Sequence, residues 1–274
     1  MVEGFVFKQN YDFNDLVEIT HILRSPGGCP WDREQTHESI RRDFIEETYE
    51  VIEAINKQSS EMLCEELGDV LLQVTLHSEM EAEKGVFNIN DVADGICKKL
   101  IERHPHVFGE VTVSGTGEVL TNWDAIKKNS KNQKTQTDSM LAVPREFPAL
   151  MRADKVQNKA RKVGFDWDSA DGAFDKLAEE FKELQEAIDC GNRENIKEEF
   201  GDLLFSVVNV SRFIGCDSEE CLTNATDKFI DRFAVVEKLA AERNIDMKTA
   251  GVEELDKLWD LAKASQKESS FEDK

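Results

Sequence analysis

The sequence predicts an all-α protein made of two tandem, related helical-bundle domains. Apolar residues recur at helical spacing along most of the 274 residues, and only five prolines interrupt them. Two acidic blocks in the first half, 46–55 and 65–74, recur in the second half as 179–188 and 198–207, with the same separation between the blocks. Repetition at a fixed offset is typical of a duplicated structural unit.

The first half reads as four helices. An opening helix is expected at 13–23, and it ends at the turn sequence Ser25-Pro26-Gly27-Gly28. Apolar positions at helical spacing then predict helices over 44–55 and 63–74, and the short connection between them favours an antiparallel pair. A further helix follows near 90–103.

The second half repeats this pattern. The segments 179–188 and 198–207 predict an antiparallel pair joined by Cys190-Gly191-Asn192, and 218–241 predicts the helix that follows. We therefore expect an N-terminal domain over 1–126 and a C-terminal domain over 146–264.

Polar sequence separates and ends these domains. A linker is expected over 127–145, where 127–138 lacks apolar periodicity, and 265–274 is expected to be a frayed tail.

Composition excludes several classes of function. With 34 Lys+Arg against 56 Asp+Glu, the formal charge of −22 disfavours a broad nucleic-acid surface, but not a small anionic ligand held through cations. The six cysteines form no CxxC motif, which suits reduced thiols. No segment resembles a signal peptide or a membrane span, so we expect a cytoplasmic protein without a membrane partner.

Each half carries four acids whose spacing predicts a metal site. They are Glu47, Glu50, Glu66 and Asp69 in the first half, and Glu180, Glu183, Glu199 and Asp202 in the second. Acids three residues apart share a helical face, and both pairs lie along the same edge of their apolar stripes, so they should converge when the helices pack. Converging carboxylates repel and need a cation; oxygen ligands suit Mg²⁺, with Mn²⁺ as a substitute.

Two other interpretations of these acids are weaker. A single ExxE motif is more often the solvated face of a helix, but repetition at a fixed phase beside the core argues against that interpretation. The pairs Glu18–His21 and Glu34–His37 could suggest a di-iron bundle, yet prolines and glycines separate them and the second half contains no histidine.

Basic and aromatic residues are candidates for substrate binding. Lys99 and Arg103 are four residues apart, and Lys228 and Arg232 repeat that spacing in the second half. Such a pair could hold phosphate oxygens, although an ordinary surface pair is the alternative. Trp259 could pack against the core or stack on a base.

These motifs resemble the MazG family of nucleoside triphosphate pyrophosphohydrolases, which belongs to the all-α NTP pyrophosphatases. The resemblance rests on EExxE followed by ExxD in each half, and it spans about residues 14 to 262. Further similar segments are 29–32 with 35–37, 104–108 and 163–167.

The resemblance implies Mg²⁺-dependent hydrolysis of nucleoside triphosphates to nucleoside monophosphate and pyrophosphate. It also implies a homodimer in which each half completes a helical bundle with its counterpart, and it places the main activity in the C-terminal half. Matched by position, Glu180, Glu183, Glu199 and Asp202 bind metal, Lys228 and Arg232 bind phosphates, and Trp259 lies near the nucleotide.

Several neighbouring residues are weaker candidates. Lys176, one turn before Glu180, falls where relatives of the family touch the ligand. Asn195 stands where some relatives have lysine, so Lys197 and Glu198 become candidate substrate contacts beside Glu199.

Glu179 is the candidate catalytic residue. It lies about 100° round the helix from Glu180 and could act as a base or orient the attacking water. The alternative function is a non-catalytic Mg–nucleotide sensor or a helical interaction protein, and it is distinguished by whether nucleoside monophosphate and pyrophosphate are released. The preferred nucleotide, and whether the first quartet is active, stay open.

Overall fold

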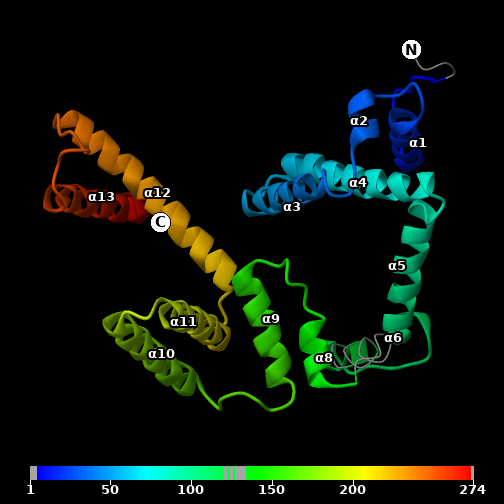
Figure 1. Cartoon of the computed structure of the whole chain (residues 1–274). Coiled ribbons are helices and arrows are strands. Elements are labelled where there is room, and N and C mark those ends of the chain that lie inside the picture. Colours follow the sequence, from blue (N-terminus) through cyan, green and yellow to red (C-terminus); the bar gives the residue numbers. More distant parts are fainter. Residues whose placement is uncertain (1–4, 120–121, 124–125, 127–133, 273–274) are drawn as a thin grey trace. The chain divides into compact units, whose positions relative to one another are not determined.

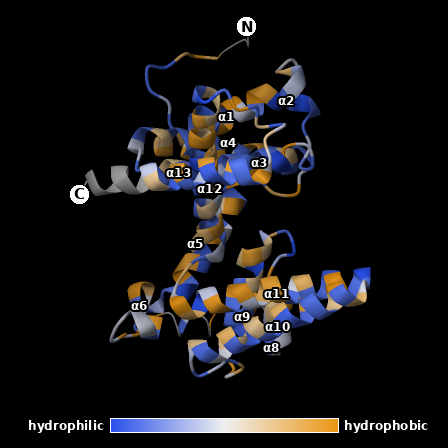
Figure 2. Cartoon of the chain, turned by 90° about the vertical axis from the view of Figure 1, so that its left-hand side faces the viewer, coloured by the Kyte–Doolittle hydropathy of each residue, from blue (hydrophilic) through white to orange (hydrophobic). Residues whose placement is uncertain are grey.

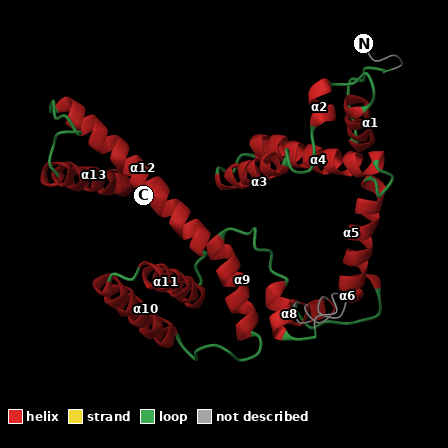
Figure 3. Ribbon diagram, in the orientation of Figure 1, coloured by secondary structure: helices red, strands yellow, loops and turns green. Residues whose placement is uncertain are grey.

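The chain folds into helices, and it divides into two compact units, residues 1–130 and 131–274 (Figure 1). The structure is a computed structural model, and it describes residues 5–119, 122–123, 126 and 134–272. Within these residues no β-strand occurs (Figure 3), so the predicted all-α class is confirmed. None of the described helices has the length and apolar composition of a membrane span.

The first unit is organised around one long antiparallel helix pair. Its elements are α1 (Phe13–Arg24), α2 (Pro30–Glu34), α3 (Arg41–Asn56), α4 (Ser60–Glu83), α5 (Ile89–Arg103) and α6 (Pro105–Phe108). Helix α3 packs along α4, and α1 packs on α4 as well. Ile40, Leu76 and Met80 form the buried core of this unit. The predicted helices all occur, and α4 extends beyond its predicted end.

Local sequence explains where these helices begin. Asp12 caps α1 and Asn88 caps α5, each through a capping box with the acid three residues later, Asp15 and Asp91. Ser59 caps α4 by accepting a hydrogen bond from the backbone N–H of Met62. Such caps satisfy backbone donors that have no partner within the helix, and each typically contributes about 1 kcal/mol.

The second unit repeats the helix pair and adds a second hairpin of helices. Its elements are α8 (Gln136–Leu141), α9 (Ala149–Arg161), α10 (Ala170–Cys190), α11 (Arg193–Ile214), α12 (Ser218–Glu242) and α13 (Val252–Glu272). Helix α10 packs along α11, α9 packs on α11, and α12 packs along α13. Val236, Ala240, Leu258 and Ala262 form the buried core between α12 and α13.

The turn between α10 and α11 determines how their acids meet. Gly191 ends α10 with φ of 70°, a left-handed conformation that glycine adopts without steric cost. Asn192 then caps α11 by accepting from the backbone N–H groups of Glu194 and Asn195. The turn is therefore short, and the chain reverses direction with the two helices in contact.

Two segments differ from the sequence expectation. Within the expected linker 127–145, residues 127–133 lie outside the described part, while 136–141 form α8, which packs on α9. Thr135 caps α8 and Asp138 completes its capping box. This helix start was missed from the sequence because the surrounding residues are polar. The expected frayed tail, 265–274, continues as helix to Glu272.

Many apolar side chains stay exposed on the helix pairs of each unit. Figure 2 shows hydrophobic residues along α5 and α11, among other helices. In the second unit Phe181, Phe200, Phe229 and Ile230 are each more than half exposed. Exposed apolar surfaces of this kind commonly mark interaction sites.

Candidate active site

Three carboxylates of the second unit converge where α10 meets α11. Oxygen atoms of Glu180, Glu199 and Asp202 all lie within 4.8 Å of one another. Glu180 is 5% exposed on α10, whereas Asp202 is exposed on α11. One carboxylate of the cluster is therefore buried and another is open to solvent. A metal ion held here could bind the protein and still be reached by a ligand from solvent.

Like charge and burial disturb the titration of this cluster. The pKa of Glu199 is raised by partial burial and by the negative charges of Glu183, Glu180 and Asp202. Glu183 therefore lies near enough to act on Glu199, although it is outside the closest group. A cation would remove the repulsion, so the donor set fits a hard metal ion.

Lys176 neutralises part of this charge from within α10. Its Nζ lies 2.7 Å from Oε1 of Glu179 and 2.7 Å from Oε1 of Glu180. These two bonds raise the pKa of the Lys176 ammonium group, so the lysine stays charged. Glu179, the candidate catalytic residue, is more than half exposed and is held by the same lysine.

The first unit contains an equivalent cluster with a different neighbour. Oxygen atoms of Glu47, Glu66 and Asp69 lie within 4.8 Å of one another, and all three residues are half-buried. Burial raises the pKa of Glu47 and of Glu66, and the charge of Glu50 adds to both shifts. Repeat alignment puts Asp43 where the second unit has the lysine, so this cluster lacks that cation.

The predicted phosphate-binding residues belong to the hairpin of α12 and α13. Lys228 and Arg232 lie on α12, and the Arg232 guanidinium carbon is 5.9 Å from the centre of the Trp259 ring. Trp259 packs against the core of this hairpin and against Phe229, with 5.1 Å between ring centres. The packing of Trp259 against the core is therefore confirmed, and stacking on a base stays a prediction.

Lys197 and Glu198, the candidate substrate contacts next to Glu199, lie outside the carboxylate cluster. Lys197 pairs with Glu194 at 2.7 Å, and its side chain is 69% exposed. Glu198 is exposed, and its charge contributes to the raised pKa of Glu199. Neither residue belongs to the close carboxylate group.

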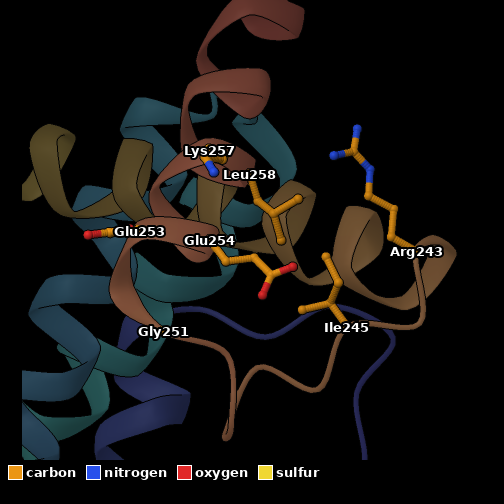
Figure 4. A pocket seen from close by; sticks show the side chains of 7 residues that line it. All are labelled: Arg243, Ile245, Gly251, Glu253, Glu254, Lys257 and Leu258. Atoms are coloured by element: carbon orange, nitrogen blue, oxygen red, sulfur yellow. The ribbon is translucent and has the colours of Figure 1, made fainter.

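A hollow of about 350 Å³ lies at the turn between α12 and α13. Figure 4 shows the side chains that line it. Its lining includes Arg243, Glu253, Glu254 and Lys257, and Glu254 and Ile245 extend into the space between the helices. It includes none of the predicted site residues. The candidate site therefore stays at the carboxylates.

A second cavity was not predicted from the sequence. It has a volume of about 510 Å³ and lies between α9, α11 and the segment 164–167. Polar residues at its wall include Gln157, Asn209 and Arg212. The aromatic segment 163–167 was the available sequence signal, but nothing in the sequence showed that it faces α11.

Comparison with known proteins identifies the family. The MazG nucleotide pyrophosphohydrolase domain matches residues 35–108 and 170–236, which contain both carboxylate clusters. The chain is 45% identical to the Thermotoga maritima nucleoside triphosphate pyrophosphohydrolase/pyrophosphatase MazG over 92% of this chain and 95% of that protein. It is 40% identical to the Escherichia coli K12 nucleoside triphosphate pyrophosphohydrolase over 90% of this chain and 95% of the relative.

A third relative has a longer chain. The uncharacterized protein YabN of Bacillus subtilis is 45% identical over 94% of this chain, which corresponds to 53% of YabN. The match to both halves, together with near-complete coverage of the two shorter relatives, confirms the resemblance seen in the motifs. This chain belongs to the MazG nucleotide pyrophosphohydrolase family.

Proposed function

We propose that this protein hydrolyses nucleoside triphosphates to nucleoside monophosphate and pyrophosphate at the carboxylate cluster of the second unit. The observation that carries the proposal is the convergence of Glu180, Glu199 and Asp202 within 4.8 Å, next to Lys176, in a chain of this family. Two relatives of nearly the same length are named for this activity.

The ligand atoms fit magnesium, with manganese as a substitute. All are carboxylate oxygens, the donors that hard divalent cations prefer, and Glu183 lies near enough to complete the set. When bound, Mg²⁺ would supply charge neutralisation for the phosphate oxygens and a water of lowered pKa. The half-buried setting of Glu199 limits competition from bulk water for its oxygen.

Lys176 and Glu179 have complementary roles in this proposal. Lys176 holds both Glu179 and Glu180. An arriving triphosphate offers the ammonium group new oxygen partners, which releases Glu179. The freed carboxylate can then orient the attacking water or accept its proton.

Basic residues of α12 are proposed to bind the phosphate oxygens that metal leaves uncovered. Lys228 and Arg232 share one face of that helix at i,i+4 spacing, and Trp259 supports the guanidinium. Lys197 and Glu198 are proposed only as outer contacts of the substrate, because Lys197 pairs with Glu194 and points to solvent.

We infer that the protein acts as a homodimer. Phe181, Phe200, Phe229 and Ile230 are more than half exposed, and the face of α10 and α11 also carries an apolar groove of about 460 Å³. A second copy would cover these side chains, as expected where each half completes a bundle with its counterpart. A nucleotide substrate and free cysteines suit a cytoplasmic location, and the net charge of −22 disfavours nucleic-acid partners.

The first cluster is proposed to be a weaker or regulatory site. Its acids also have oxygen atoms within 4.8 Å of one another, but Asp43 stands where Lys176 would be. An additional acid near the triphosphate would oppose binding rather than assist it. Metal binding can persist there while turnover falls.

Matched charge-neutralising variants test the proposal. Glu199→Gln removes one ligand of the second cluster, Glu66→Gln removes its repeat equivalent, and Glu186→Gln changes an exposed acid of α10 outside the cluster. With ATP or dGTP and Mg²⁺, nucleoside monophosphate and pyrophosphate should appear with wild type, Glu66→Gln and Glu186→Gln. Glu199→Gln should lose this activity by about a hundredfold or more.

The products also separate the alternatives. Retained turnover in Glu199→Gln would contradict the metal assignment. Nucleotide binding without turnover by the wild-type protein would favour the sensor function. Release of nucleoside diphosphate and phosphate would show that the protein removes the terminal phosphate instead of pyrophosphate.

A further inference from the structure

Two histidines of the first unit meet in a contact that depends on their protons. Nδ1 of His37, which lies between α2 and α3, is 2.7 Å from Nδ1 of His77 on α4, and the two rings stack with 5.0 Å between their centres. Nε2 of His37 lies 2.7 Å from Oε1 of Glu81, also on α4. All three residues are half-buried. The contact therefore joins the segment before α3 to α4 through two imidazole rings.

A short turn positions His37 for this contact. The backbone N–H of Thr36 donates to Oγ of Ser39 at 2.9 Å, and the backbone N–H of Ser39 donates to Oγ1 of Thr36 at 3.2 Å. Ile40 follows and is 1% exposed in the core of this unit. Because local side-chain bonds order the backbone on one side and a core residue holds it on the other, the imidazole of His37 meets α4 from a fixed position.

The short distance limits how many protons the two rings can carry together. A hydrogen bond between two Nδ1 atoms needs one N–H and one lone pair, and an imidazolium offers N–H groups only. The carboxylate of Glu81 accepts from Nε2 of His37, so that nitrogen carries a proton. His37 is then either charged and donates to neutral His77, or neutral and accepts from it. If both rings are charged, two N–H groups face each other and the bond is lost.

Charged groups around His37 come from its own segment and from α4. Oε1 of Glu81 bonds to Nε2 of His37 and to the ammonium group of Lys84, at 2.7 and 2.6 Å. Glu38 follows His37 in the chain and is exposed. Two carboxylates and one ammonium group thus surround this ring, and their net negative charge favours a proton on His37.

His77 has more apolar surroundings. From α3 it meets the ring of Phe44, with 5.7 Å between ring centres. Burial and the positive charge of His37 lower the pKa of His77 from its ordinary value of 6.5. The other ionisable side chains that join α1 to α4 pair with each other: His21 with Glu79 and Arg24 with Glu83.

The second unit carries apolar residues where these histidines lie. At the offset that aligns 46–55 with 179–188, Ala170 and Val210 occupy the positions of His37 and His77. Val210 is 8% exposed, so an apolar side chain is sufficient for packing at this point of the helix pair. Packing alone therefore does not explain the two histidines of the first unit.

We propose that His37 and His77 form a pH-sensitive latch, which joins the segment 35–40 to α4 near neutral pH and loosens when acid charges both rings. The segment leads directly into α3, where Phe44 contacts His77 and lies three residues before Glu47 of the first carboxylate cluster. The latch therefore controls how firmly this end of α3 is held beside the first cluster. The proposal does not depend on the reaction that either cluster supports.

The direction of the pH dependence follows from the lowered pKa of His77. The unfolded chain takes up this proton near the ordinary value of 6.5, whereas the folded unit takes it up only at lower pH. The stabilisation by the latch is therefore fully present above pH 6.5 and is lost as pH falls through the lower, folded value.

Amide hydrogen exchange of the full chain measures the latch, with EDTA present to remove metal ions and with rates corrected for the intrinsic effect of pH. In the wild type, protection of the amides in 36–44 should fall by about tenfold between pH 7.5 and 5.5, the effect of losing about one hydrogen bond. Amides of the aligned segment 169–177 should change by less than about twofold, because the second unit has an equivalent carboxylate cluster but no histidine.

Two variants separate the latch from other effects of acid. His77→Val introduces the residue that the second unit has at the aligned position, so the helix pair can still pack. It should abolish the pH-dependent change in 36–44. His21→Gln is the matched control, because His21 also pairs with a glutamate of α4 but its side chain is 63% exposed and lies outside the latch. It should keep the wild-type change.

Imidazole nitrogen NMR of the wild type gives a second measurement that needs no variant. It should show Nε2 of His37 protonated at pH 7.5 and His77 taking up its proton below pH 6.5. Protection in 36–44 that is the same at pH 7.5 and 5.5 in the wild type would overturn the latch. The same conclusion would follow from a change that survives His77→Val, or from a His77 ring that becomes charged at or above pH 6.5.

Discussion

Replacing Asp166 by asparagine should destabilise the second unit by about 2–4 kcal/mol at pH 7. The carboxylate accepts two short hydrogen bonds from Arg212, at 2.6 and 2.7 Å, and both side chains are largely buried. Asparagine offers one acceptor oxygen in place of two, so one of these bonds is lost and the other is weakened. Bonds to charged groups contribute about 1.5–3 kcal/mol each and neutral ones about 0.5–1.5, so the change costs about 2–4 kcal/mol. Leaving a buried cation without its counter-charge favours the upper end of this range.

The pH dependence gives this prediction a second, independent measure. Hydrogen bonds from Arg212 hold the pKa of Asp166 below its ordinary value of 3.8. The stabilisation is therefore fully present above the pKa of the unfolded chain and is lost as pH falls through the lower, folded value. The difference between wild type and Asp166→Asn should be constant from pH 7 to 5 and should shrink as pH falls below the ordinary pKa of aspartate.

Urea unfolding followed by tryptophan fluorescence measures both effects. Lys182→Gln is the control, because it breaks an exposed 3.4 Å pair with Glu186 and should change stability by less than about 0.5 kcal/mol. A loss below about 1 kcal/mol for Asp166→Asn at pH 7 would refute the structural role of the pair. A difference that persists unchanged at pH 2 would show that charge is not its cause.

Three further predictions follow from the candidate site. Lys176→Met should raise KM for Mg–ATP about tenfold, whereas Lys197→Met should change it less than twofold; equal effects in steady-state kinetics would contradict the placement of these lysines. Because the pKa of Glu199 is raised, protons should compete with Mg²⁺ at higher pH than for an ordinary glutamate, and calorimetric Mg²⁺ affinity that stays flat from pH 7 to 5 would oppose this. Phe181→Glu should shift sedimentation from dimer to monomer, while Phe7→Glu, at an exposed position near the N-terminus, should not.

Helical periodicity made much of the site predictable. Glu199 and Asp202 are three residues apart, so any helix through them places both on one face, whatever surrounds it. Their phase relative to the apolar stripe then set which way they face when α11 packs on α10. The repeat removed the main alternative, since an ordinary solvated face has no reason to recur at the same phase.

Helical periodicity could not predict which segments distant in the chain contact one another. Polar composition suggested a linker where α8 forms, because the capping box at Thr135 was outweighed by the surrounding lysines and asparagines. Trp259 had two interpretations, and its packing against the core and against Phe229 confirms the first, while stacking on a base stays a prediction. The cavity at Gln157 depends on α9 meeting α11, which no local pattern specifies.

The sequence alone therefore determined the helical class, the duplication, the two sets of acids and the family resemblance, because each of these is a matter of residue type and short-range spacing. Tertiary structure decided that Glu180 is the buried member of its cluster, that Lys176 holds Glu179 and Glu180, and that Gln157 has a buried oxygen without a hydrogen-bond partner among the described residues. Burial and hydrogen-bond pairing depend on which surfaces of different helices meet, and that is settled only when the whole unit packs.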